Sequence, residues 1–275
     1  MRFGITLPIA GVDGDVRKAL EYASLAEKAG WDGVFIEDYV YFAPGKSPVF
    51  DPWITMAGVA TRTEKIRMGI TVTPLARRRP WMVAKQAATL DHLSGGRLII
   101  GVGVGASEDR SFAAFGDPAD IKVRAEMTDE ALDVILGLWT GQAFSHRGKH
   151  YQVNDVAMLP KPVNGPRVTL WIGGGWPRKS VIARAARGDG ACCFKVTEKG
   201  MDMLNPDDVR EMKATFAHNP AFDIVVGGTT PGDKPAKARA QVAPLAEAGA
   251  TWWSEFGYSS GKVLRRRIEQ GPPRG

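Results

Sequence analysis

The chain has 275 residues, of which 44% are hydrophobic and 24% are charged, and its formal net charge is +6 at pH 7. These proportions are ordinary for a globular protein, and no apolar run approaches the roughly 20 residues that a membrane-spanning helix needs. The basic residues are scattered and accompany no RNA- or DNA-binding motif. The composition therefore indicates neither a membrane protein nor a nucleic-acid-binding protein.

Two features of the sequence bear on the cellular compartment of the protein: its N-terminal segment and its cysteines. Residues 1–8 are a short strand-like segment, and no signal-peptide pattern follows them. Cys192 and Cys193 are adjacent in an apolar run, and neighbours that face opposite sides of a strand make poor disulfide partners. We therefore expect reduced thiols and a cytoplasmic protein.

Strand-like and helix-like segments alternate along the chain. The first half predicts strands at 2–7, 33–36, 66–72 and 98–104, and helices at 13–29, 52–64 and 80–93. The second half predicts helices at 122–138, 178–187, 207–217, 235–248 and 263–268, and strands at 168–172, 191–196, 222–226 and 251–256. Residues 144–165 lack a helical period and carry turn residues, so they are predicted to form an excursion between the fourth and fifth strands.

This alternation favours an α/β fold of the closed (β/α)8 (TIM) barrel type, in one domain spanning residues 1–275. The alternative is an open doubly wound sheet, which requires a dinucleotide-binding glycine motif after the first strand. The chain has Pro8-Ile9-Ala10-Gly11 there, and the glycines of the fourth strand also miss the motif, because Glu108 occupies the place of its third glycine. The sequence therefore favours the barrel.

Two glycine-rich stretches follow predicted strands. Gly101, Gly103 and Gly105 alternate at the end of a continuous apolar strand, which is typical of a parallel strand buried on both faces. Bare backbone there permits either close approach of a flat ligand or tight helix–sheet packing. Gly173–Gly175 precede a helix predicted to begin near residue 176, where backbone N–H groups would suit a phosphate or simply make a flexible turn.

Few residues offer acid–base or metal chemistry. Ser107 has no adjacent histidine, and no G-x-S-x-G motif occurs. His146 and His150 lie in the excursion with Gly148 between them, so no metal site is predicted. Trp171, Trp252 and Trp253 are expected to fill the barrel. A site with few acids or metals but much exposed backbone fits chemistry that a bound organic cofactor supplies.

Several segments resemble the bacterial-luciferase-like oxidoreductases, which use flavin or the deazaflavin F420. The matching segments include AEKAGWDGVFIED (26–38), ITVTPL (70–75), AKQAATLDHLSGGRLIIGVGVG (84–105), MTDEALDVILGLWTG (127–141) and WIGGGWPRKSVIARAARGDG (171–190). They follow in order to about residue 194, and the last third of the chain is a looser match. The fold that this resemblance implies is again a (β/α)8 barrel.

The resemblance also implies where a cofactor would lie. A bulge on the third strand, often with a non-proline cis peptide, would support the isoalloxazine ring, and glycines after the fourth and fifth strands would lie along its edge and near its phosphate. The implied cofactor contacts are Thr71, Val72, Thr73, Gly103, Gly105, Ala106, Gly173, Gly174, Gly175, Trp176 and Arg178.

Three residues are implied as catalytic: Glu108, Asp38 and Tyr39. In F420-dependent relatives an acid after the fourth-strand glycines donates a proton, and Glu108 is the candidate here, slightly later in the loop than the pattern. Many relatives carry a histidine directly after the aspartate that matches Asp38, whereas this chain has Tyr39. A phenol with an ordinary pKa near 10 is a hydrogen-bond donor rather than a base at neutral pH. The departure disfavours alcohol or sugar oxidation.

The resulting hypothesis is an oxidoreductase that transfers a hydride between F420 and a small organic substrate. The alternatives are an FMNH2-dependent monooxygenase of the same family and a non-catalytic flavin-binding barrel. Basic residues at Arg77–Arg79 and Arg178–Lys179 would suit the acidic tail of F420. The expected partners are a small-molecule substrate, a flavin or F420 reductase, and a second copy of the chain in a homodimer.

Overall fold

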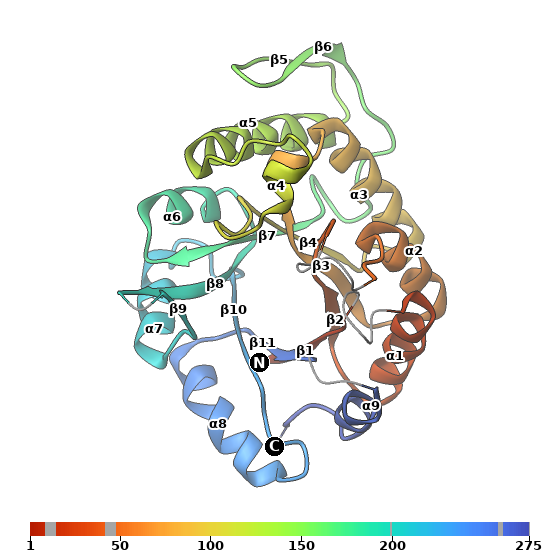
Figure 1. Ribbon diagram of the computed structural model, residues 1–275, viewed down its shortest axis with the longest axis vertical. Coiled ribbons are helices and arrows are strands. Elements are labelled where there is room, and N and C mark those ends of the chain that lie inside the picture. The colour runs from red at the N-terminus through yellow and green to blue at the C-terminus, as the bar shows by residue number, and fades with distance from the viewer. Residues whose placement is uncertain (9–14, 42–47, 199, 258–260, 275) are drawn as a thin grey trace.

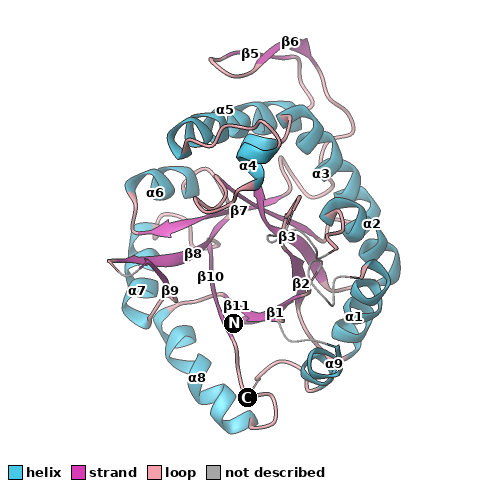
Figure 2. Ribbon diagram, in the orientation of Figure 1, coloured by secondary structure: helices cyan, strands magenta, loops and turns pink. Residues whose placement is uncertain are grey.

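The computed structural model describes residues 1–8, 15–41, 48–198, 200–257 and 261–274, and its strands form a closed ring (Figures 1 and 2). Eight parallel strands pair in the order β10-β11-β1-β2-β3-β4-β7-β8, and pairing of β10 with β8 closes the barrel. Their bounds are β1 (Arg2–Thr6), β2 (Gly33–Ile36), β3 (Arg67–Pro74), β4 (Leu98–Gly103), β7 (Thr169–Trp176), β8 (Gly190–Thr197), β10 (Asp223–Gly228) and β11 (Trp252–Phe256). The predicted (β/α)8 barrel is confirmed.

Helices surround this ring of strands (Figure 2). They are α1 (Val16–Lys28), α2 (Pro52–Arg62), α3 (Pro80–Ser94), α4 (Ser111–Ala114), α5 (Ile121–Trp139), α6 (Lys179–Ala185), α7 (Pro206–Thr215), α8 (Pro235–Ala248) and α9 (Gly261–Glu269), with a 3-10 turn at Leu75–Arg77. The helix predicted from residue 13 begins in the structure at Val16; residues 13 and 14 lie outside the described part. As predicted, Asp51 caps α2 by accepting from the Ile54 N–H at 2.8 Å, with Pro52 at the first helical position.

Three local features differ from the sequence prediction. Gly173–Gly175 continue strand β7 to Trp176 rather than forming a loop, because they pair with Cys192–Phe194 of β8. Strand β9 (Gly200–Asp202) runs antiparallel to β8, and the short helix α4 follows the β4 loop. Tertiary pairing supplies the hydrogen bonds that keep the glycines extended, which the glycine run itself does not predict.

A small cluster of buried side chains, separate from the main hydrophobic core, fills the inside of the barrel below the carboxyl ends of the strands. Phe35, Trp171 and Trp252 pack with ring centroids 5.3–5.8 Å apart, and Ile99 and Val225 complete the cluster. Trp171 and Trp252 thus fill the barrel as predicted, whereas Trp253 packs in the larger core between strands and helices. The space above this aromatic cluster, at the carboxyl ends of the strands, remains for a site.

The excursion is an antiparallel hairpin, β5 (Phe144–Arg147) and β6 (Gln152–Val156), which lies beyond α5 at the edge of the barrel (Figure 1). Glu130 of α5 holds its turn: the carboxylate accepts from the backbone N–H groups of Lys149 (2.7 Å), His150 (2.9 Å) and Tyr151 (3.0 Å). Partial burial works against ionisation, but these donors outweigh it and hold the pKa of Glu130 below its usual range.

Glu130→Gln is expected to lower the free energy of unfolding by about 1 kcal/mol, because an amide presents one acceptor oxygen where the carboxylate presents two. Since the pKa is depressed in the folded state, this contribution is present above the unfolded pKa of about 4.3 and is lost as the pH falls through the folded value. Urea denaturation at pH 7 and pH 3 measures both. Glu247→Gln, an exposed carboxylate of α8 outside this turn, is the control; an equal effect of both substitutions would contradict the assignment.

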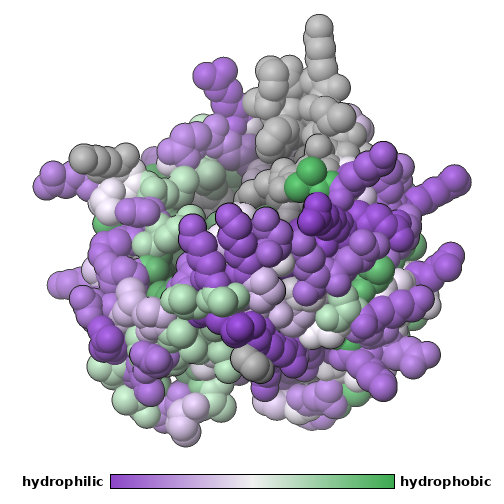
Figure 3. Space-filling view, turned by 90° about the horizontal axis from the view of Figure 1, so that it is seen from below, coloured by the Kyte–Doolittle hydropathy of each residue, from purple (hydrophilic) through white to green (hydrophobic). Residues whose placement is uncertain are grey.

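The outer surface carries mainly polar side chains. On the face shown in Figure 3, hydrophilic residues predominate and hydrophobic ones lie in small separate groups. Among the described helices, none is both long enough and apolar enough to cross a membrane.

Candidate active site

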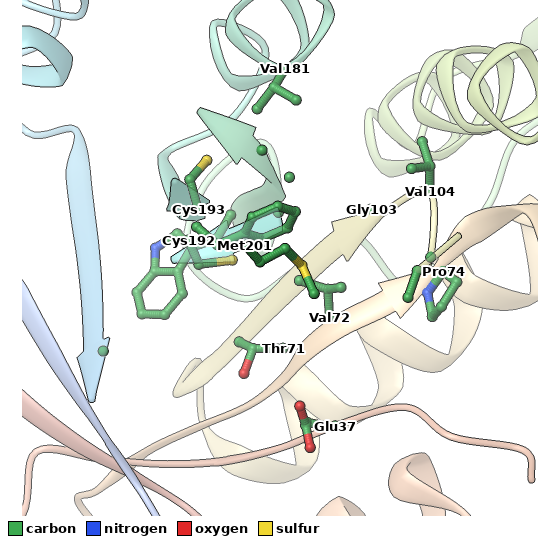
Figure 4. Close-up of a pocket in the computed structure, with 18 of the residues that line it drawn as sticks. Glu37, Thr71, Val72, Pro74, Gly103, Val104, Val181, Cys192, Cys193 and Met201 are labelled. Atoms are coloured by element: carbon green, nitrogen blue, oxygen red, sulfur yellow. The ribbon is translucent and has the colours of Figure 1, made fainter. Parts of the chain in front are cut away.

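A cavity of about 790 Å³ opens at the carboxyl ends of the barrel strands. Phe35 and Trp171 of the aromatic cluster form part of its floor, and the loops after β2, β4 and β7 contribute to its sides. Figure 4 shows Glu37, Thr71, Val72, Cys192 and Met201 around this opening. The position agrees with the general rule that (β/α)8 barrels build sites at this end.

One side of the cavity is made of backbone. The peptide bond between Thr71 and Val72 is cis, and the register of β3 against β4 shifts between Ile70 and Thr73, so the predicted bulge with a cis peptide is confirmed. Gly103 and Gly173 on the neighbouring strands β4 and β7 lie against Val72; we call these two residues the glycine wall. A Cβ atom on Gly173 would lie 2.6 Å from Val72 Cγ1, so the glycine is what lets Val72 pack directly on the backbone of β7.

Most of the predicted cofactor contacts line this cavity. The lining ones are Thr71, Val72, Gly103, Gly105, Ala106, Gly173, Gly174, Gly175 and Arg178. Thr73 and Trp176 do not line it, which corrects the sequence prediction. Thr73 is fully buried, and the buried Trp176 donates its indole N–H to Glu211 Oε2 of α7 at 3.2 Å. Alternation along β7 turns Trp171, Gly173 and Gly175 inward and Trp176 outward.

The basic run Arg77–Arg79 is also placed differently from the prediction. Arg77 pairs with Asp109 and lies over the Phe112 ring, Arg78 binds Asp38, and Arg79 lies over the Trp81 ring. None of the three lines the cavity. These arginines are therefore structural, and they do not support binding of an anionic ligand there.

Both predicted catalytic acids, Asp38 and Glu108, line the cavity, and each already has a hydrogen-bond partner. Asp38 is buried and bound by Arg78 through two hydrogen bonds of 2.9 Å. Glu108 is exposed at the rim, where Ser107 Oγ donates to Oε1 at 2.7 Å and holds the pKa of the carboxyl below its usual range. An ionised, solvated carboxylate at neutral pH is a poor proton donor.

Glu37, which was not among the predicted site residues, also lines the cavity. Residues alternate at the end of β2, so that Phe35 and Glu37 face the cavity while Ile36 packs outward. The Tyr39 hydroxyl donates a hydrogen bond to Glu37, and burial together with the charge of Glu37 raises the pKa of the phenol. Tyr39 is therefore neutral and acts as a donor, as predicted, and it holds the Glu37 carboxylate in the cavity. The period-2 alternation was the signal that could have found Glu37.

Both cysteines line the cavity and are free, which confirms the predicted thiols. Burial raises the pKa of Cys192 to about 12 and that of Cys193 further. Thiols that stay protonated at neutral pH are poor nucleophiles, so they contribute surface rather than chemistry.

Comparison with known proteins identifies the family. Residues 1–271 match the model of a family described as luciferase-like monooxygenase. The chain belongs to this family. It is a luciferase-like oxidoreductase, of a kind whose members use a flavin or F420.

The relatives include both dehydrogenases and monooxygenases. An F420-dependent glucose-6-phosphate dehydrogenase from Amycolatopsis mediterranei is 32% identical over 195 residues, which are 68% of this chain and 55% of that protein. The chain thus spans about half the length of the curated relatives it matches. Among solved structures, an F420-dependent secondary alcohol dehydrogenase superposes with a TM-score of 0.77 and 18% identity, covering 98% of this chain and 96% of that one. A monooxygenase from Streptomyces bottropensis gives 0.79 and 18%, covering 98% and 97%. At this identity the two structures show the fold alone.

Proposed function

We propose that this luciferase-like oxidoreductase uses F420 and transfers a hydride between the deazaflavin and a small organic substrate. The observation that carries the proposal is the cis Thr71–Val72 bulge, which seats Val72 on the glycine wall at the side of a cavity large enough for a tricyclic ring. The names of the curated relatives favour F420 over FMN, since the first of them are F420-dependent dehydrogenases. When bound, F420 would act as the donor or the acceptor of the hydride.

One cationic side chain of the cavity, that of Arg178, is placed to bind an anionic group of the cofactor. Arg178, which precedes α6, lines the cavity on the side of Gly173–Gly175. The other lining arginine, Arg184, is held by Asp129 with Nε and Oδ1 2.6 Å apart. Within the described part of the chain, Arg178 has no such carboxylate partner. We assign it to the phosphate of the cofactor, with the Ser180 hydroxyl beside it on the lining.

Proton transfer is assigned to Glu37. A hydride carrier moves two electrons and one proton, so the substrate oxygen must gain or lose the second proton elsewhere. Glu37 faces the cavity, receives a hydrogen bond from Tyr39 and is set among Phe35 and Thr71. Glu37 can serve as the acid or base for which many relatives carry a histidine, so the Tyr39 departure does not leave the site without one.

Titration of the protein with F420 and with FMN, followed by fluorescence, tests the proposal. F420 is expected to bind more tightly than FMN, and Arg178→Gln is expected to weaken F420 binding about tenfold through loss of a charge-assisted hydrogen bond. Arg187→Gln, beyond the other end of α6 and paired with Asp133, is the control and should bind as wild type does.

The same titration separates the alternatives. Tighter binding of FMN, with oxygen consumption by the reduced protein, would favour the monooxygenase. Binding without any substrate-dependent oxidation or reduction of the cofactor would favour a non-catalytic flavin-binding barrel. The homodimer and a reductase partner stay predictions.

A further inference from the structure

We propose that the organic substrate is an uncharged, largely apolar alcohol or ketone, whose body lies against the β8–β9 side of the cavity and whose oxygen faces Glu37. This inference rests on the proposed function and adds the substrate class. It also sets this chain apart from the glucose-6-phosphate dehydrogenases among its relatives.

Three of the ionic side chains that line the cavity are held in ion pairs. Asp38 and Asp109 are bound by Arg78 and Arg77, and Arg184 is bound by Asp129. Among the described lining residues, Arg178 is the cation that remains, and it is assigned to the cofactor. No second lining cation is left there for a phosphate on the substrate, whereas Glu37 and Glu108 would repel one.

The opposite side of the cavity is hydrophobic and unusually exposed. The apolar wall consists of Phe194, Val196, Met201, Met203 and Leu204, which lie on β8, on β9 and just after β9. Met201 is 66% exposed and Met203 51%, although both face a cavity and not a smooth outer surface. Exposed large apolar side chains around a cavity mark a place where a ligand covers them. Methionine side chains adapt to apolar ligands of varied shape.

The two sides are arranged to orient one substrate. In the closed ring β2, which leads to Glu37, and β8, which leads to the apolar wall, are four strands apart and therefore face each other across the barrel. Figure 4 shows Met201 and Glu37 on different sides of the opening, with Val72 between them. A molecule with one oxygen and an apolar body would reach both sides and pass over the glycine wall.

The reaction balances with these groups. In the oxidising direction the alcohol carbon gives a hydride to oxidised F420, and the hydroxyl proton passes to the Glu37 carboxylate. The C–H and O–H bonds break, the C=O bond forms, the alcohol is oxidised to a ketone and F420 is reduced. The reverse direction uses reduced F420 and protonated Glu37.

The test compares cyclohexanol with glucose 6-phosphate, using F420 absorbance for turnover and saturation-transfer NMR for binding of each compound to the F420-loaded protein. Cyclohexanol should bind and be oxidised, and glucose 6-phosphate should do neither. Met201→Lys should raise the KM for cyclohexanol about tenfold or more, because a charged group replaces an apolar contact, while F420 affinity stays within about twofold. Met82→Lys, an exposed methionine of α3 outside the cavity, is the matched control and should change neither value.

The outcomes separate the substrate class from the proposed function. Oxidation of glucose 6-phosphate with a kcat/KM equal to or above that of cyclohexanol, or an unchanged KM in Met201→Lys, would overturn the substrate class and leave the proposed function standing. F420 binding without binding or turnover of cyclohexanol would also overturn the substrate class, and the proposed function would then stand if another substrate oxidises or reduces the bound cofactor. Failure of F420 to bind would overturn both proposals.

Discussion

Glu37→Gln is expected to slow hydride transfer by about 10²- to 10⁴-fold, the usual loss when a positioned acid–base group is removed. The amide keeps the size of the side chain and still accepts from Tyr39, but it cannot take the substrate proton. A single turnover of F420 with the alcohol that the wild-type protein oxidises fastest measures the rate of the step, and an F420 titration of the same variant checks that cofactor affinity is retained.

Two further variants make this test specific. Tyr39→Phe should cost less, about tenfold, because it removes the hydrogen bond that orients Glu37 but leaves the carboxylate. Glu108→Gln is the control, since Glu108 is exposed at the rim and already ionised. If Glu108→Gln slowed the step as much as Glu37→Gln, the proton would pass through the β4 loop, as the family pattern implies.

Glu255→Ala is expected to lower the free energy of unfolding by about 3–5 kcal/mol, because it leaves a buried network without its anion. Glu255 is fully buried at the end of β11 and accepts from the Thr230 N–H (2.7 Å), the Thr230 hydroxyl (2.8 Å) and the Trp253 indole (2.8 Å). Arg267 of α9 donates to it at 3.2 Å. One carboxylate thereby joins β11, the loop after β10 and the last helix.

Urea denaturation of Glu255→Ala measures this effect, with Glu269→Ala as the control. Glu269 also pairs with an arginine of α9, but both side chains of that pair are about half exposed, so its loss should change stability little. Similar denaturation midpoints for the two variants would show that the Glu255 network does not hold the C-terminal helix to the barrel.

The fold could be predicted because the pattern of this chain is consistent from end to end. Eight apolar segments alternate with amphipathic ones, and signals such as Asp51-Pro52 mark where helices begin. The hairpin at 144–156 could only be predicted as an excursion, because Glu130, which fixes its turn, lies on another element. A single amino-acid sequence does not show which elements that are distant in sequence contact each other in the fold.

The site could be predicted only in part, because some of its features depend on local sequence and others depend on partners from distant elements. The glycines and the Thr71–Val72 bulge carry a local signal, whereas the tasks of the charged residues depend on partners. Arg77–Arg79 look available in the sequence but are engaged in the structure by Asp109, Asp38 and Trp81. The inward position of Glu37 and the outward position of Trp176 follow from the alternation of side chains continued to the ends of β2 and β7.

We expect the ring of F420 to lie in the cavity against the Thr71–Val72 bulge and the glycine wall on which Val72 packs. A crystal structure of the protein with F420 tests it most directly. We expect the deazaflavin ring to lie over Val72, edged by Gly103 and Gly173, with Arg178 near the phosphate and Glu37 facing the ring. Electron density for F420 outside this cavity, or a side chain filling the space beside Val72, would contradict it.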